Sequence, residues 1–351
     1  MGPRVGPAAV GPLVAPDAAR GALPRQQVQA VSMTFIVIAS VFLSILIALT
    51  SAAAAAGNHL PPSVCLGTGE YTGDVAAKAV TTALQLGYRC IDTAHEYNNQ
   101  VAVGGAINAA LRNTSMKLRR SDLFIISKVE GGLTAAQTTA RLHVDVTSLG
   151  LGSIDLVLLH FPKALPGSTL EATIQEQWRS IAGFVGAGGA AAGGVSQFCA
   201  PALAALDAAG VSYRPVLNQV GLHVGMGPDP QGVVSTAAAR KDMQLMAYSP
   251  LAEASPQLLD SPSLLRIAKA HGPNITSADV ALRWLSQKQI PYAVAATNPV
   301  YQAQNLHAAT SQAGFELNDA ELSRLDGLAQ PAGCPFWPGS ACWALTCNRT
   351  L

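Results

Sequence analysis

Charged residues are scarce in this sequence. Asp, Glu, Lys and Arg make up 12% of its 351 residues and leave a formal net charge of +1, whereas they form about a quarter of a typical soluble domain. A chain that is 49% hydrophobic and lacks a basic excess argues against a disordered protein and against one that binds nucleic acid. Its length fits one large catalytic barrel or two average domains.

Patterns typical of metal sites and of disulfide scaffolds are also missing. Six cysteines in 351 residues are too few for a small fold held together by disulfides. No CxxC pair and no Cys/His cluster has the spacing of metal ligands, so we expect no metal. Cys334, Cys342 and Cys347 lie close together in the C-terminal tail and favour a disulfide if the domain is lumenal, but their state stays open.

Charge is absent altogether from residues 26–69. Within this window residues 34–49 (TFIVIASVFLSILIAL) are apolar, and the Ala-rich residues 51–56 either extend them to the length of a membrane span or resemble a signal-peptidase site. We therefore expect residues 1–57 to be a leader with a signal or anchor segment at about 33–56, and a membrane-anchored, secretory or lumenal protein. An organelle transit peptide and a buried core helix are the alternatives, and Met33 is a second candidate initiator that leaves residues 1–32 in question.

After the leader, short apolar runs alternate with Ala-rich helical patterns. Helical spacing of apolar residues is clearest over residues 101–111 and 135–149. Strand–helix alternation indicates parallel strands, and eight such units in about 270 residues predict a (β/α)8 barrel over residues 58–330, followed by a Cys- and Trp-containing tail over 331–351. No GxGxxG follows the first run, and the Gly-rich run 186–193 is expected to be a loop. The expected strands are 64–68, 90–93, 123–129, 154–161, 194–198, 216–224, 244–251 and 292–297.

Four polar residues fall at or just after the ends of three consecutive strands. Asp92 ends the second, Tyr97 follows it, Lys128 ends the third and His160 ends the fourth. Because catalytic side chains of such barrels gather at the carboxyl ends of the strands, we expect these four to share one patch. Each taken alone has an ordinary structural explanation, such as a cap, a packed rim or a satisfied core histidine.

The chemistry of the four groups is complementary. An ammonium beside a phenol lowers the phenol pKa, so Lys128 can make Tyr97 a better acid, and Asp92 can keep Lys128 charged. His160 can hydrogen-bond the oxygen that receives the proton. Such an acid needs a hydride source, which implies a nicotinamide cofactor. An aldolase with Lys128 as a Schiff base is an alternative that leaves Tyr97 and His160 without a role.

With these motifs in order, residues 61–329 resemble the aldo-keto reductases. The resemblance rests on GYRCIDTAHEYNN (87–99), FIISK (124–128), IDLVLLHFP (154–162), GVSQF (194–198), NQV (218–220), AYSPL (247–251), ALRWL (281–285) and FELNDAELSRL (315–325). It implies reversible NAD(P)H-dependent reduction of aldehydes or ketones by a monomer, with Tyr97 as the acid. The cofactor residues implied by the resemblance are Gly67, Thr68, Ser196, Gln197, Gln219, Tyr248, Ser249, Leu251, Thr297 and Asn305.

Some positions depart from the family pattern. Gln197 stands where Asn is usual, and Ala295 and Tyr301 replace two cations that usually hold the adenosine 2'-phosphate. Each lost charge-assisted hydrogen bond is worth about 1.5 to 3 kcal/mol, so the choice between NADP and NAD stays open. Gly69 stands where Trp is common and predicts a wider pocket mouth. These departures keep a second hypothesis open, a catalytically weak nucleotide-binding regulatory or interaction protein on the same fold.

Overall fold

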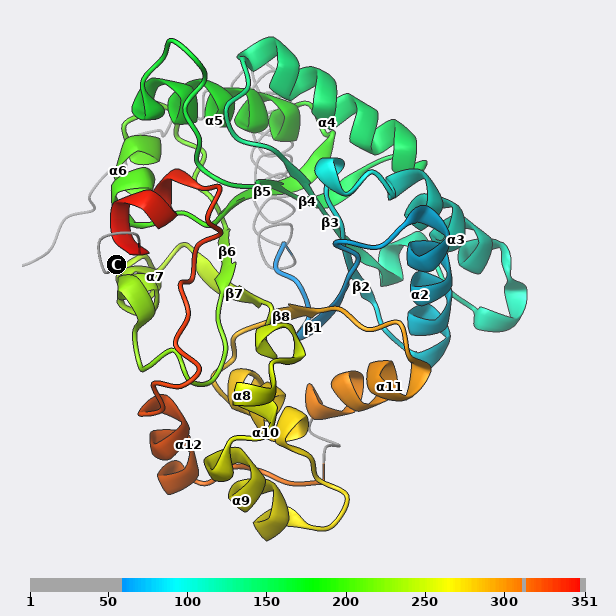
Figure 1. Cartoon of the computed structure of the whole chain (residues 1–351). Coiled ribbons are helices and arrows are strands. Elements are labelled where there is room, and N and C mark those ends of the chain that lie inside the picture. Colours follow the sequence, from blue (N-terminus) through cyan, green and yellow to red (C-terminus); the bar gives the residue numbers. More distant parts are fainter. Residues whose placement is uncertain (1–58, 311–313, 348–351) are drawn as a thin grey trace, which may run out of the picture. The chain divides into compact units, whose positions relative to one another are not determined.

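Eight parallel strands close into a barrel in the computed structural model, which describes residues 59–310 and 314–347. Each strand pairs with the next along the chain, and β8 pairs with β1 through Val64 opposite Tyr292. Figure 1 shows the helices around this barrel. The predicted (β/α)8 barrel is confirmed. The strands are β1 Val64–Gly67, β2 Cys90–Asp92, β3 Phe124–Val129, β4 Ile154–Leu159, β5 Ala190–Ser196, β6 Leu217–Gly221, β7 Gln244–Tyr248 and β8 Tyr292–Val294.

The helices begin at residues that suit a helix start. Thr134 accepts a hydrogen bond from the backbone of Gln137 at the start of α4, and Thr276 does the same for Asp279 at the start of α10. Gly87 ends α2 with φ 109°, a backbone angle that glycine adopts freely. The helices are α2 Gly73–Leu86, α3 Gln100–Arg112, α4 Ala135–Leu149, α5 Leu170–Gly186, α6 Ala200–Asp207, α7 Val233–Ala239, α8 Pro256–Leu259, α9 Pro262–His271, α10 Ser277–Gln287, α11 Pro299–Ala308 and α12 Asp319–Asp326.

The core has two layers. A large outer cluster packs the strands against the helices and includes the fully buried Trp178 of α5. A smaller cluster comes mainly from strand residues and fills the interior of the barrel. Because side chains alternate along a strand, the next residue on the same inner face lies two positions further on. The buried members of the inner cluster are Cys65, Cys90, Ile126, Leu156, Leu158, Ala192, Leu217, Met246 and Ala293.

Strand β5 begins earlier than predicted. The structure extends it over Ala190–Ser196, so the second half of the Gly-rich run that was predicted to be a loop is a strand. A side chain at Gly194 would come within 2.8 Å of both the Leu158 side chain and the Leu217 carbonyl oxygen. Small residues are therefore required where β5 passes between β4 and β6. Because Ala and Gly have low strand propensity, the sequence pattern did not indicate that the strand begins at Ala190.

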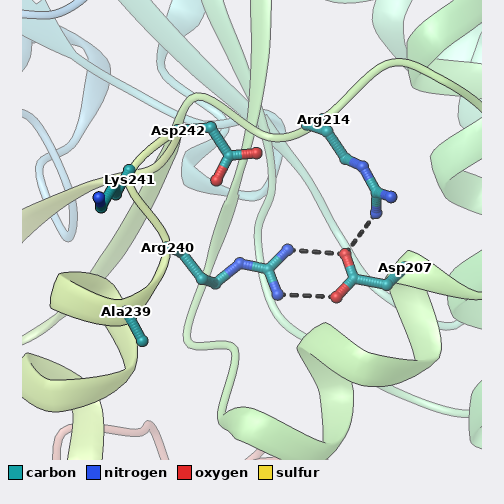
Figure 2. Close-up of a pocket in the computed structure, with 6 residues that line it drawn as sticks. All are labelled: Asp207, Arg214, Ala239, Arg240, Lys241 and Asp242. Carbon is teal, nitrogen blue, oxygen red and sulfur yellow. Dashed lines mark hydrogen bonds and ion pairs between the residues drawn. The ribbon is translucent and has the colours of Figure 1, made fainter.

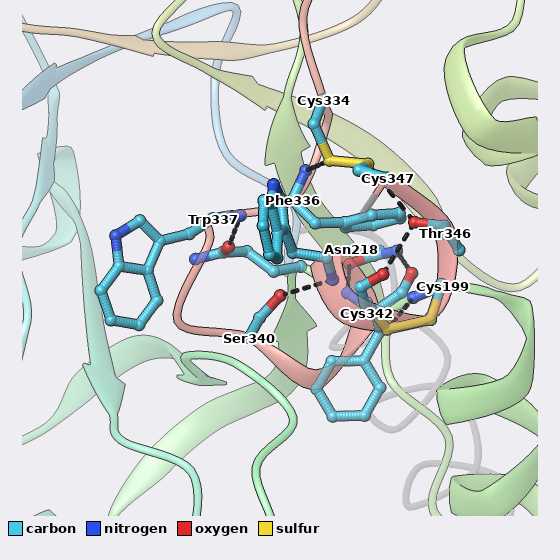
Figure 3. Close-up of a disulfide and its surroundings, with 12 residues drawn as sticks. Cys199, Asn218, Cys334, Phe336, Trp337, Ser340, Cys342, Thr346 and Cys347 are labelled. Atoms are coloured by element: carbon cyan, nitrogen blue, oxygen red, sulfur yellow. Dashed lines mark hydrogen bonds between the residues drawn. A yellow bond between two sulfur atoms is a disulfide. The ribbon is translucent and has the colours of Figure 1, made fainter. Parts of the chain in front are cut away.

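All six cysteines are paired. Cys65 and Cys90 join β1 to β2 inside the barrel, Cys199 joins the start of α6 to Cys342, and Cys334 joins Cys347 within the tail. Figure 3 shows the last two bridges beside Phe336 and Trp337. The tail, red in Figure 1, runs from α12 to the neighbourhood of α6. The Cys199–Cys342 bridge and a buried Phe336, 1% exposed, thus tie the tail to the barrel on the side of β5 and β6.

The expected localisation needs correction. Among residues 59–310 and 314–347, no helix has both the length and the apolar character needed to cross a bilayer. The apolar run that led us to expect a membrane-anchored, secretory or lumenal protein, at about residues 33–56, lies outside the described residues. We therefore withdraw that prediction.

Candidate active site

The predicted catalytic residues extend the inner face of the barrel toward its carboxyl end. Asp92 lies two positions after Cys90, and Lys128 lies two positions after Ile126, so both point into the barrel above apolar neighbours. Asp92 is 3% exposed and Lys128 is 1% exposed. His160 follows Leu158 in the same way, immediately after the end of β4. The apolar layer thus forms the floor beneath a polar layer.

Lys128 is the centre of the hydrogen bonds in this layer. Its Nζ donates to Asp92 Oδ1, to the Thr93 carbonyl oxygen at 3.2 Å and to the Tyr97 hydroxyl at 3.3 Å. The same Nζ lies 5.0 Å from the centre of the Tyr97 ring. A buried ammonium with three acceptors keeps its charge, because its hydrogen-bonding capacity is satisfied.

The electrostatics follow from these contacts. Burial has the strongest effect on the pKa of Lys128 and by itself lowers it, but Asp92 and Tyr97 together outweigh burial and the pKa is raised. Burial raises the pKa of Tyr97, and Lys128 lowers it by a smaller amount. The expected effect of Lys128 on Tyr97 is therefore present, yet it does not dominate. Tyr97 keeps its proton at neutral pH and can act as an acid.

His160 lies beside Tyr97. The two ring centres are 5.8 Å apart with an angle of 76° between the planes. The Nδ1 atom of His160 lies 2.9 Å from Oε2 of Glu96, the residue before Tyr97. Burial has the largest effect on the pKa of His160 and lowers it, while the hydrogen bond to Glu96 opposes that shift. All four predicted catalytic residues are thus brought together.

A network that the sequence analysis missed supports the Tyr97 loop. Asn99 donates to the carbonyl oxygens of Thr68 and Tyr71, which ties this loop to the one after β1. On the other side His95 Nδ1 lies 2.6 Å from Asp145 of α4. The only signal in the sequence was the polar run HEYNNQ itself, since Asp145 is remote from it along the chain.

The groups expected to hold a nicotinamide lie at the end of β5 and within β6. Gln219 donates its amide to Asp92 Oδ2 at 2.7 Å, and Ser196 donates its hydroxyl to the Gln219 carbonyl oxygen at 2.9 Å. The hydroxyl oxygen of Ser196 and the amide oxygen of Gln219 can still accept hydrogen bonds from a carboxamide. Two buried polar groups beside the Asp92–Lys128 pair therefore fit a nicotinamide amide.

Gln197 departs from this arrangement. Its Oε1 accepts a hydrogen bond from the backbone N–H of Trp337 in the tail. Its backbone has φ 63°, in the left-handed region that Asn adopts more readily than most residues. The Trp337 ring in turn lies 5.2 Å from that of Phe161, the residue after His160. The tail therefore reaches both the expected cofactor side and the His160 side of the site.

The remaining expected cofactor residues follow β7, β8 and β1. Tyr248 is partly buried at the end of β7, and its pKa is raised by burial. Ser249 has φ 47° and opens a loop in which residues 252–254 also have positive φ, an uncommon run near Leu251. Gly67 ends β1, and the Thr68 hydroxyl donates to the Asp92 carbonyl oxygen at 3.1 Å.

The residues after the end of β8 that replace the family's usual phosphate-binding cations are neutral. Ala295 and Thr297 are exposed, and Tyr301 is 58% exposed on the first turn of α11. Asn305 is buried in the same helix. A dianionic phosphate placed here would meet neutral side chains.

Gly69 lies against the Tyr97 ring. A Cβ at this position would be 3.3 Å from Tyr97 Cζ. A large side chain here would therefore have to turn away from the phenol or press on it. The absence of a side chain leaves that edge of the Tyr97 ring uncovered by residue 69.

A shallow hollow of about 520 Å³ lies elsewhere. Arg240 and Arg214 both reach the carboxylate of Asp207 within it, at 2.6 Å each (Figure 2). Its residues end α6 or precede β6 and β7, so it belongs to the amino ends of the strands, opposite to Tyr97. We assign it no role in the chemistry of the site.

Comparisons with known proteins agree with this geometry. A model of the Aldo/keto reductase family matches residues 63–330. An aldo-keto reductase of Mycolicibacterium smegmatis is 33% identical over 283 residues, which cover 80% of this chain and 90% of that protein. A probable NAD(P)H-dependent D-xylose reductase of Emericella nidulans is 31% identical and covers 76% of this chain and 90% of its own length.

Solved structures give the same result. An aldo-keto reductase from a deep-sea metagenome library superposes with a TM-score of 0.68 at 27% identity and covers 80% of this chain and 96% of its own. A Bombyx mori aldo-keto reductase in complex with NADP has a TM-score of 0.65 at 27% identity, covering 76% of this chain and 88% of its own.

Proposed function

The chain belongs to the aldo/keto reductase family, and from this premise we propose that it reduces aldehydes or ketones to alcohols with Tyr97 as the general acid. The observation that carries the proposal is the buried ammonium of Lys128, which donates to both Asp92 and the Tyr97 hydroxyl. A phenol held in this way can give up a proton and leave a phenolate whose charge the ammonium stabilises.

Each residue of the site has a role in this reaction. Tyr97 donates its hydroxyl proton to the substrate oxygen, and Lys128 stabilises the phenolate that remains. Asp92 keeps Lys128 charged, and His160 hydrogen-bonds the substrate oxygen once that oxygen has received the proton. When bound, a nicotinamide cofactor supplies a hydride to the carbonyl carbon. The partner is a small carbonyl or alcohol substrate, and we propose that the protein acts as a monomer.

Several residues are proposed to hold that cofactor. Ser196 and Gln219 offer acceptors for the carboxamide beside Asp92, and the Tyr248 ring offers a surface on which the nicotinamide can stack. The backbone after β7 and β1 can follow the phosphates. The full set is Gly67, Thr68, Ser196, Gln197, Gln219, Tyr248, Ser249, Leu251, Thr297 and Asn305.

We further propose that NADP is not strongly preferred over NAD. Ala295 and Tyr301 provide no positive charge for a 2'-phosphate, and Tyr301 is 58% exposed. At a neutral site NADPH cannot form the charge-assisted hydrogen bonds that would give it a higher affinity than NADH. The proposal predicts affinities for the two cofactors within about tenfold of each other.

The test is an assay of the full chain with NADH and NADPH against a panel of aldehydes, ketones and aldoses. D-xylose belongs in the panel because the Emericella nidulans relative is a probable D-xylose reductase. We expect cofactor oxidation that depends on the carbonyl compound, and loss of about 10² to 10⁴-fold in kcat/KM in Tyr97→Phe. Cofactor binding without turnover of any carbonyl compound would reject the enzyme.

The hydrogen bond between Gln197 and Trp337 favours the second candidate, in addition to the neutral Ala295 and Tyr301. A side chain already engaged by the tail is less available to a carboxamide. A nucleotide-binding regulatory protein of low activity would bind NAD(P)H and leave every carbonyl compound unchanged. The same assay separates the two functions.

A further inference from the structure

Glu96 contacts the imidazole of His160. It lies in the short 3-10 turn His95–Tyr97, directly before the proposed acid, and its Oε2 is 2.9 Å from His160 Nδ1. An ionised carboxylate can only accept a hydrogen bond. The proton in this contact therefore belongs to Nδ1 of His160.

The second ring nitrogen is left for a ligand. Among the hydrogen bonds formed by residues 59–310 and 314–347, none involves His160 Nε2. Around the ring lie Tyr97, with ring centres 5.8 Å apart, and Phe161 at 5.3 Å. A neutral imidazole with its proton on Nδ1 has a lone pair on Nε2 and accepts a hydrogen bond there.

The charged surroundings favour the neutral ring. Titratable groups face His160 from three elements: Asp92 from β2, Glu96 and Tyr97 from the turn after it, and Lys128 from β3. Burial and Lys128 lower the pKa of His160, whereas Glu96 and Asp92 raise it, and the net shift is downward. At neutral pH the imidazole is uncharged, and because its single N–H is on Nδ1 beside Glu96, Nε2 has no proton to donate to a carbonyl oxygen.

We propose that Glu96 is a positioning residue that holds the proton of His160 on Nδ1, so that Nε2 accepts a hydrogen bond from the hydroxyl of the alcohol. This inference rests on the proposed function. In the reduction, the Tyr97 proton passes to the substrate oxygen while the carbon receives the hydride, and the new hydroxyl then donates to Nε2. In the reverse reaction the same contact orients the alcohol hydroxyl for proton transfer to the Tyr97 phenolate.

The direct test is the position of the proton, read by NMR of the full chain labelled with ¹⁵N-histidine and free of cofactor. Long-range ¹H–¹⁵N spectra at about pH 8 distinguish protonated from unprotonated ring nitrogens in a neutral ring, and His160→Gln identifies the signal. We expect the proton on Nδ1 in the wild type and in Glu96→Gln, whose amide oxygen can still accept it. In Glu96→Ala we expect the Nε2-protonated form to become populated.

Two NMR results would overturn the role of Glu96. One is a wild-type ring protonated on Nε2, and the other is an Ala variant with the wild-type spectrum. Because this readout needs no turnover, it decides the inference even if no carbonyl compound is reduced, in which case only the proposed function fails.

Steady-state kinetics give a second readout. Losing one neutral hydrogen bond corresponds to about two- to tenfold in affinity. We therefore expect Glu96→Ala to raise KM for an alcohol by that factor, with a smaller change in KM for the corresponding aldehyde, and Glu96→Gln to restore the wild-type value. The matched control is Glu171→Gln, an exposed carboxylate on the first turn of α5. Equal changes for alcohol and aldehyde would contradict the proposed contact.

Discussion

The two sides of the site are held in place differently. On the side of β2, β3 and β4, the proposed proton-transfer groups contact one another: Lys128 donates to both Asp92 and Tyr97. On the side of β5 and β6, Gln197 is held by Trp337 of the tail, which is bonded to the barrel through Cys199–Cys342 and closed on itself by Cys334–Cys347. The first side depends mainly on consecutive strands and the turn after β2, whereas the second depends on a segment far away along the chain.

This difference decides how a substitution acts. A change at the first side removes a group from the chemistry and leaves a buried charge unpaired, which affects both rate and stability. A change at the second side alters whether Gln197 hydrogen-bonds the tail or the cofactor. We expect such a change to affect cofactor affinity and to have a smaller effect on turnover. The following substitutions test that order.

The largest effect is expected from Lys128→Met. It removes the ammonium beside Tyr97 and leaves the carboxylate of Asp92, 3% exposed, without its ion-pair partner. We expect kcat/KM for carbonyl reduction to fall about thousandfold and the free energy of unfolding to fall by about 3 to 5 kcal/mol. Activity assays and urea denaturation measure the two.

The matched control is Lys288→Met. Lys288 also pairs with an aspartate, at 2.8 Å from Asp326, and its side chain is 32% exposed. Removing a partly exposed pair costs about 0 to 1 kcal/mol. If Lys288→Met lowered kcat/KM and the free energy of unfolding as much as Lys128→Met, the buried Asp92–Lys128 pair would have no special role.

Removing disulfides tests the second side. Residues 199 and 342 are separated by 143 positions, and 334 and 347 by 13. Chain-entropy arguments give about 5 kcal/mol for the long loop and about 3 kcal/mol for the short one. We expect Cys199→Ala with Cys342→Ala to lower the free energy of unfolding more than Cys334→Ala with Cys347→Ala. Equal losses would show that the tail is anchored mainly by its other contacts.

Tyr301→Arg tests the phosphate end of the cofactor side. It adds a cation on the first turn of α11, where Tyr301 is 58% exposed. We expect the affinity for NADPH to rise about tenfold relative to NADH, because one charge-assisted hydrogen bond is gained. Val300→Arg adds the same charge at the adjacent position, 60% exposed, and should change the ratio less. An unchanged ratio in Tyr301→Arg would place the phosphate elsewhere.

Gln197→Asn has the smallest expected effect. The shorter side chain suits φ 63° better and no longer reaches the backbone of Trp337 as Gln197 does. Freed from the tail, its amide becomes available to a carboxamide, and NAD(P)H affinity should rise about threefold. Cofactor fluorescence measures this, and weaker binding would show that the tail contact supports the cofactor site.

Sequence reasoning predicted the first side well because the relevant information is local. The spacing of Asp92, Lys128 and His160 at the ends of consecutive strands is enough to bring them together once the barrel is assumed. The eight strands were found for the same reason, although β5 was misplaced because its Ala and Gly residues are selected by close packing and not by strand propensity.

The second side was predicted less well because its contacts are remote. Nothing in the spacing of Cys199 and Cys342 reveals their pairing, and nothing near Gln197 points to the Trp337 backbone. On the first side the same holds for Asp145 and His95, which are brought together by packing between α4 and the turn after β2. The net direction of the pKa shift of Tyr97 also depends on how deeply the phenol is buried, which cannot be obtained from the sequence.

Hydride transfer in a single turnover is the most direct test of the claim that Tyr97 delivers the proton in carbonyl reduction. Enzyme saturated with NADH or NADPH in which both hydrogens of the nicotinamide C4 are deuterium is mixed with an aldehyde that the wild type accepts, and the alcohol is analysed. We predict deuterium on the carbinol carbon in the wild type and a rate about 10² to 10⁴-fold lower in Tyr97→Phe, with cofactor binding retained. A Tyr97→Phe variant that transfers deuterium at the wild-type rate would contradict it.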